Sequence, residues 1–114
     1  MSRFAARTDS AHAEIRNTLR RLGFAVFDTA RLGNGYPDLH VSLGGFAVLV
    51  EVKSPGGRFT PAEADFAQGW QGPLLIARTV REAVSGFYKL RRLSGYTPGD
   101  PLWYRVLLDK WGSQ

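Results

Sequence analysis

The spacing of hydrophobic residues changes along the first third of the chain from a helical period to a strand period. Apolar residues recur at intervals of three or four before Gly23: Ala11, Ile15, Leu19 and Leu22. This spacing predicts a helix that Ser10 caps and Gly23 ends. Residues 24–29 (FAVFDT) are then predicted to form a strand, and residues 31–36 (RLGNGY) a loop.

Two alternating apolar runs flank Gly44 and Gly45, which is the signal of a β-hairpin with a two-residue turn. A hairpin symmetric about this turn brings Asp38 directly opposite Glu51, at a non-hydrogen-bonded pair, where the two strands approach most closely. Because side chains alternate between the two faces of a strand, one face is wholly apolar and is predicted to be core. It carries Leu39, Val41, Leu43, Phe46, Val48, Val50 and Val52.

The segment after the hairpin carries the signals of a helix start. Thr60 is placed as an N-cap, Pro61 as the first helical residue, and Glu63 as the acid that completes a capping box. Residues 73–77 (PLLIA) form a short apolar run and are predicted to be a strand.

A second capping box, Thr79 with Glu82, predicts a helix that reaches about Arg92. Asp100 and Pro101 predict one more helix start, with a terminal strand as the alternative for the residues that follow. The order αβββαβα predicts an α/β fold with one mixed β-sheet flanked by helices. We expect a single domain over residues 1–114, with its core at about 10–92 and a C-terminal extension at 93–114.

The composition is that of an ordinary globular domain with an excess of positive charge. Of the 114 residues, 44% are hydrophobic and 22% are charged, which argues against disorder. No apolar run approaches the roughly 20 residues of a bilayer span, and the first residues have no signal-peptide pattern. The absence of cysteine excludes thiolate metal sites and favours a reducing, cytoplasmic location. A net charge of +5 favours a polyanionic partner such as nucleic acid.

The second face of the predicted hairpin supplies the candidate chemistry. It brings the carboxylates of Asp38 and Glu51 and the ammonium of Lys53 together at the open end of the sheet. Opposed like charges destabilise a sheet unless one acid stays protonated, Lys53 pairs with them, or a cation binds. Oxygen ligands without cysteine favour Mg²⁺ or Mn²⁺, which typically bind substrate phosphates as well. This set of groups therefore predicts metal-assisted hydrolysis of phosphodiester bonds. The alternative interpretation is a solvated cluster of surface charges without catalytic function.

These residues resemble the motifs of the PD-(D/E)xK nuclease superfamily, and more closely those of the VRR-NUC (virus-type replication-repair nuclease) family. That family has a Glu on its first helix, a G-x-P-D-L element, an E-x-K strand and an [LF]-[ST]-P-x-Q helix start, in this order. The matching segments here are Glu14, residues 35–39 (GYPDL), residues 51–53 (EVK) and residues 59–63 (FTPAE). The resemblance covers about residues 10–92.

The resemblance implies a restriction-endonuclease-like core that cuts DNA with Mg²⁺ or Mn²⁺. Asp38, Glu51 and the backbone carbonyl of Val52 would bind the metal, and Glu14 would contribute directly or through water. Lys53 would position the attacking water or stabilise the charged transition state.

Three further polar residues are candidates for the site, and two of them also have a structural interpretation. Glu63 stands where the family often has Gln, and its capping role is the favoured interpretation over a catalytic one. Gln68 is an alternative source of an amide. His40 lies two residues from Asp38 on the acidic face, where it either hydrogen-bonds a ligand water or simply fills a strand position.

The flanks of the motif supply candidates for nucleic-acid binding. Arg58 is the preferred phosphate contact, and Gly57 allows the backbone to approach a ligand closely. Tyr36 either stacks on a base or sugar or packs under the loop. A wider DNA footprint, with ordinary solvated surface as the alternative, draws on Arg20, Arg21, Arg78, Arg81, Arg91 and Arg92.

The sequence therefore predicts a metal-dependent DNA endonuclease from phage or bacterial replication or repair. We expect it to select DNA by structure (junctions, flaps or ends) and to act as a homodimer if it cuts both strands. A helicase or another replication-repair protein is a further candidate partner. A Holliday-junction resolvase and a nuclease for RNA or single strands are alternatives on the same fold. A catalytically silent nucleic-acid-binding module is the alternative of another class.

Overall fold

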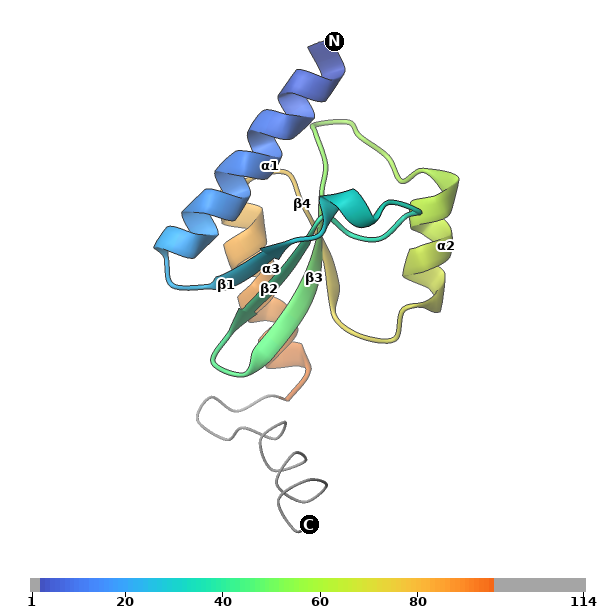
Figure 1. The fold of residues 1–114 in the computed structure, drawn as a ribbon. Helices are drawn as coiled ribbons and strands as arrows, with labels where there is room; N and C mark the ends of the chain where they lie inside the picture. The colour runs from blue at the N-terminus through green and yellow to red at the C-terminus, as the bar shows by residue number, and fades with distance from the viewer. Residues whose placement is uncertain (1–2, 96–114) are drawn as a thin grey trace, which may run out of the picture.

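The computed structural model describes residues 3–95, with side chains from residue 10 onward, as one sheet flanked by helices (Figure 1). The predicted order of elements is confirmed, with one additional 3₁₀ turn, η1, in the predicted loop. The elements are α1 (Arg3–Arg21), β1 (Ala25–Asp28), η1 (Ala30–Leu32), β2 (Leu39–Leu43), β3 (Phe46–Val52), α2 (Pro61–Gly69), β4 (Leu74–Ala77) and α3 (Val80–Leu93).

The sheet is mixed, as predicted, with the strand order β1-β2-β3-β4. The β1–β2 and β2–β3 pairs are antiparallel, and β4 runs parallel to β3. The β2–β3 register pairs Leu43 with Phe46 and Leu39 with Val50, which is the symmetric hairpin that the sequence predicts. Gly44 and Gly45 form its turn with φ of 61° and 87°, values that favour glycine.

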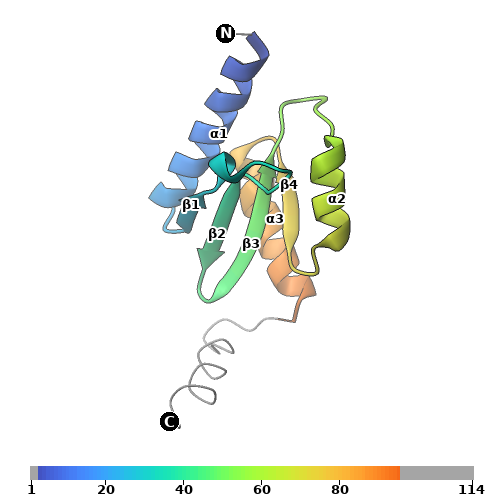
Figure 2. The ribbon, with the colours of Figure 1, turned by 45° about the vertical axis from the view of Figure 1, so that its right-hand side comes forward.

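The helices cover the two faces of the sheet unequally. The buried side chains of α1 and α3 belong to one core cluster with the apolar face of the hairpin. Figure 2 shows α2 on the other side of β3 and β4, away from α1 and α3. The β3–α2–β4 connection is thus a crossover between two parallel strands. The C-terminal ends of β3 and β4 therefore lie side by side at the same end of the sheet.

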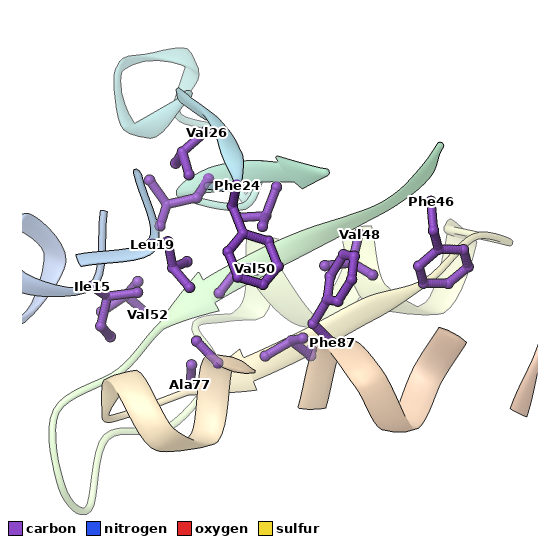
Figure 3. Close-up of a cluster of buried hydrophobic side chains, with 14 residues drawn as sticks. Ile15, Leu19, Phe24, Val26, Phe46, Val48, Val50, Val52, Ala77 and Phe87 are labelled. Carbon is purple, nitrogen blue, oxygen red and sulfur yellow. The ribbon is translucent and has the colours of Figure 1, made fainter. Parts of the chain in front are cut away.

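The core lies between the sheet and the α1–α3 layer (Figure 3). Ile15 and Leu19 of α1 and Phe87 of α3 are each only 1% exposed, and the Phe24 and Phe87 rings pack edge to face at 5.0 Å between centroids. All seven residues of the predicted core face belong to this cluster or pack against it. Burial of this apolar surface is the main source of stability for the domain.

Helix boundaries confirm most of the predicted caps. Thr60 and Glu63 form the full capping box of α2, with Pro61 in the first turn. Thr79 caps α3, but the Glu82 carboxylate accepts the backbone N–H of Arg78 at 2.7 Å, so the second box has a different reciprocal partner from the predicted one.

The prediction that Ser10 caps the first helix is wrong, because α1 already begins at Arg3. Residues 3–9 (RFAARTD) contain no glycine or proline to stop a helix, so the helix continues upstream of Ser10. Its end is as predicted: Phe24 N–H bonds Leu19 C=O, Gly23 N–H bonds Arg20 C=O, and Gly23 has a φ of 100°.

Two sequence predictions concern the ends of the chain. The further helix or strand after Asp100 and Pro101 lies outside the described residues, and α3 extends to Leu93, the first residue of the expected C-terminal extension. Within residues 3–95, no helix is long and apolar enough to cross a membrane.

A polar contact ties α1 to the edge strand β1. Asp28 Oδ2 accepts a hydrogen bond from Arg16 Nη1 at 2.8 Å and lies 2.8 Å from His12 Nε2. Burial acts to raise the pKa of Asp28, but the hydrogen bonds from His12, Arg16 and the Ala30 N–H outweigh it and lower the pKa to about 2.

We expect Asp28→Asn to cost about 1 kcal/mol of unfolding free energy at pH 7, since the carboxylate is partly solvated and its interactions are screened. A depressed folded-state pKa gives stability that is present above the ordinary value of 3.8 and is lost as the pH falls toward 2. Urea unfolding at pH 7, 4 and 2 is the measurement. A difference between the two proteins that persists unchanged at pH 2 would contradict this assignment.

Candidate active site

A cavity of about 420 Å³ lies where β3 ends and the following loop leads to α2. It brings together most of the residues that the sequence nominates. Those that line it are Asp38, Glu51, Val52, Lys53, Gly57, Arg58 and Glu63.

The position of Asp38 is set by the loop before β2. The Asp38 and Pro37 carbonyls accept hydrogen bonds from the Thr29 N–H at 2.8 Å and the Thr29 hydroxyl at 2.7 Å. Gly35, with a φ of 82°, lies against the first turn of α2, and a Cβ there would be 2.2 Å from the Ala62 carbonyl oxygen. The glycine therefore lets this loop and α2 approach each other, and both contribute residues to the cavity, Asp38 after the loop and Glu63 in α2.

Asp38 and Glu51 occupy neighbouring strands on the second face of the hairpin. Extending the observed register by one residue places them opposite each other, and Asp38 Oδ2 accepts the Val52 N–H at 2.9 Å. Glu51 is 4% exposed, the only charged residue among the buried side chains of the described chain. Burial raises the pKa of Glu51 well above its ordinary value, and the adjacent Asp38 and Glu63 raise it further. Burial and the neighbouring acids thus both disfavour the ionised form of Glu51.

Lys53 pairs more closely with Glu63 than with Glu51. Its Nζ is 2.6 Å from Glu63 Oε1 and 3.8 Å from Glu51 Oε1, and it lies 5.8 Å from the centre of the Phe59 ring. Glu63 Oε1 also accepts the Thr60 N–H at 2.8 Å. Burial acts to raise the pKa of Glu63, but the hydrogen bonds from Lys53 and Thr60 lower it overall.

Glu63 therefore has two structural roles at once. It completes the capping box that the sequence predicts and it holds the ammonium of Lys53 at the wall of the cavity. The second contact was not predicted. The capping-box position does not signal it, because residues 53–60 separate β3 from α2 and the fold alone brings the start of α2 back to Lys53.

The donor set is compatible with a hard divalent cation. Asp38 and Glu51 offer carboxylate oxygens and Val52 lines the same cavity. Among residues 10–95, no group of three or more His, Cys, Asp or Glu side chains is arranged to hold a metal ion. Mg²⁺ commonly takes only one or two carboxylates and retains several waters, so two acids suffice. The raised pKa of Glu51 fits this interpretation, because a cation between the acids would offset their mutual repulsion.

Four nominated residues do not line this cavity. Glu14 is exposed on α1, next to the buried Ile15, and Gln68 is exposed near the end of α2. His40 Nε2 is hydrogen-bonded to the Tyr36 hydroxyl, and the two rings stack at 5.5 Å between centroids. Tyr36 also packs edge to face against Phe66 of α2 at 5.1 Å, so it lies under the loop.

Two residues at or next to the cavity were not predicted from the sequence to belong to the active site. Ser54 lines the cavity directly after Lys53, and its place in the loop is the only signal that marks it. Arg78, which follows β4, directs Nη2 to the Gly57 carbonyl oxygen at 3.5 Å. The sequence places Arg78 in the general basic surface but does not indicate that it reaches the loop of the site.

Comparisons with known proteins bear on the fold. No family model matches the sequence, and no curated protein matches it. One solved structure that this chain resembles is described as "VRR_NUC domain protein"; it has a TM-score of 0.53 and 18% sequence identity, covering 75% of this chain and 88% of the other. Similarity at this level of identity concerns the fold. The mixed four-stranded sheet flanked by helices is thus consistent with the restriction-endonuclease-like fold of a VRR_NUC domain protein.

Proposed function

We propose that this protein is a metal-dependent nuclease that hydrolyses phosphodiester bonds in DNA. The observation that carries the proposal is the convergence of Asp38, buried Glu51 and Lys53 in one cavity at the end of β3. Placing a half-buried acid opposite a buried one, next to a lysine, is costly for a structural element, and phosphodiester hydrolysis is a reaction that uses such a set. The fold shared with a VRR_NUC domain protein supports the same activity.

In this proposal Asp38 and Glu51 hold Mg²⁺ or Mn²⁺, with the Val52 carbonyl as a third protein ligand. The metal, when bound, would polarise the scissile phosphate and favour ionisation of a water. The Val52 N–H bond to Asp38 Oδ2 fixes one carboxylate, leaving its other oxygen for the ligand. Burial of Glu51 excludes water from its side chain, which strengthens its interaction with a cation.

Lys53 is proposed to act on the attacking water or on the charge that develops at phosphorus. Glu63 holds its ammonium at 2.6 Å, which orients the side chain beside the two acids proposed to bind the metal. Arg58, exposed at the rim of the cavity, is proposed to contact a phosphate together with the Gly57 backbone. Glu14 and Gln68 are not part of this proposed set.

The domain offers few elements to read bases, so we propose selection of DNA by structure, with junctions, flaps or ends as substrates. Cutting two strands would need two copies of this site and hence a homodimer. Resolution of Holliday junctions and cleavage of RNA or single strands are the related activities that the test must separate.

The experiment is cleavage of labelled linear duplex, single strand, flap and four-way junction, each with Mg²⁺, Mn²⁺ or EDTA. We expect metal-dependent cutting by the natural protein and a loss of roughly 1,000-fold or more in Asp38→Asn. Asp65→Asn, which removes an exposed carboxylate from α2, is the matched control and should cut normally. Binding of these DNAs without cutting under any condition would refute the nuclease and favour a binding module.

A further inference from the structure

A second cavity, of about 430 Å³, runs between the edge strand β4 and α3. We call it the β4–α3 groove; the residues used below are Ile76, Arg78, Glu82, Lys89 and Arg92, all of which line it. Lys89 and Arg92 lie three residues apart on α3, so they share one face of the helix. Arg78 stands at the other end of the groove, just before α3 begins.

The three cations of the groove have no acidic partner. All ion pairs among the described side chains use Asp28, Glu51 or Glu63 as the acid, so none involves Arg78, Lys89 or Arg92. The only acid of the groove, Glu82, accepts the Arg78 backbone N–H with its carboxylate at 2.7 Å. The groove is therefore a concave surface with three cations and one carboxylate, and this net positive charge attracts an anion.

The groove adjoins the candidate active site. Ile76 pairs with Glu51 across the parallel β3–β4 ladder, and the Lys53 N–H bonds the Ala77 carbonyl. Arg78 lines the groove and contacts the Gly57 carbonyl oxygen, which belongs to the loop of the site. Figure 2 shows β4 at the edge of the sheet with α3 beside it, so the groove and the candidate active site meet at this strand.

We propose that the β4–α3 groove binds backbone phosphates of the DNA strand that passes through the candidate active site, with Lys89 and Arg92 as its main contacts. This inference rests on the proposed function, since it names the path of that substrate. α3 has 14 residues and spans about 21 Å, which matches several phosphates of one strand at about 3.4 Å each along a duplex. Such contacts position the DNA and carry no sequence information.

The test measures DNA binding separately from cutting. Affinity of a short labelled duplex is measured by fluorescence anisotropy in EDTA over a series of salt concentrations, for the natural protein and for the double variant Lys89→Gln with Arg92→Gln. We expect the dissociation constant to rise about tenfold and the slope of log affinity against log salt to fall by about 2.

The matched control removes the same charge at the opposite edge of the sheet. Arg20 and Arg21 lie at the end of α1, next to β1, and Arg20→Gln with Arg21→Gln should change the affinity less than twofold. Thermal unfolding of each variant checks that the fold is kept, and Lys89→Glu supplies a second variant with a larger expected loss.

The outcomes separate the groove from the proposed function. If the natural protein cuts DNA but the groove and control variants lose affinity equally, the proposed binding role of the groove is refuted and the proposed nuclease activity is supported. If the groove variants lose affinity but no protein cuts DNA, the groove is supported and the nuclease fails. A natural protein that binds no DNA refutes both.

Discussion

Glu51→Gln is expected to stop cleavage and at the same time to stabilise the metal-free protein. Glu51 is 4% exposed and faces Asp38, so its ionised form is costly in the folded state and its pKa is raised. Glutamine keeps the shape of the side chain without the charge. If Glu51 served packing alone, the substitution would not combine a loss of cleavage with a gain in stability.

The pH dependence of this effect has a defined sign. A carboxyl whose pKa is higher in the folded than in the unfolded state binds more protons when folded, so the folded state loses stability as the pH rises above the ordinary value of about 4.5. The advantage of the glutamine variant is therefore near zero at pH 4 and grows through neutrality. At pH 8 we expect about 2 kcal/mol, or roughly 10 °C in Tm.

Thermal unfolding in EDTA at pH 4, 6 and 8, with the DNA cleavage assay alongside, measures both effects. Adding Mg²⁺ should raise the Tm of the natural protein and leave that of Glu51→Gln nearly unchanged, because binding to the folded state alone stabilises it. Asp65→Asn serves again as the exposed acid-to-amide control and should show neither change. A glutamine variant that is less stable at every pH, or that cuts at the natural rate, would contradict the assignment of Glu51.

Gly35→Ala is expected to cost about 3 kcal/mol or more of unfolding free energy and to reduce cleavage strongly. The added Cβ would lie 2.2 Å from a backbone oxygen, that of Ala62, and the φ of 82° disfavours any residue with a Cβ. Relief of the clash requires the loop and α2 to move apart. That movement displaces Asp38, three residues along the chain, and Glu63, next to Ala62.

Gly44→Ala is the matched control for this prediction. Gly44 also has a positive φ, 61°, but no atom lies within 4 Å of the Cβ that would be added. It should therefore lose only about 1 kcal/mol, from backbone strain, and retain activity. Urea unfolding and the cleavage assay compare the two variants. Equal losses of stability would show that the contact between the loop and α2 contributes nothing beyond local strain.

The hairpin shows how much a periodic pattern determines by itself. Its register follows from two glycines and strict alternation, and the structure pairs Leu39 with Val50 as predicted. A shift of one residue would turn the apolar face to solvent, so the pattern admits one solution. The meeting of Asp38 and Glu51 is a consequence of this local rule.

The local pattern misplaced or left undecided several other features. The start of α1 was predicted from a capping residue, but helix formers upstream continue the helix, and Ser10 lies inside it. His40 and Tyr36 share the functional stretch of sequence, yet packing of α2 through Phe66 directs their rings toward each other. Glu14 adjoins the core stripe of α1 and is nevertheless exposed.

The sequence by itself determined the order of elements, the faces of the hairpin and the cluster of Asp38, Glu51 and Lys53, because periodicity and turn chemistry act over a few residues. Only the tertiary structure decided that Glu63 holds Lys53 and that Arg78 joins the loop of the site to the β4–α3 groove. Both contacts depend on how the β3–α2–β4 crossover places α2 and β4 beside β3, which is set by packing across the sheet.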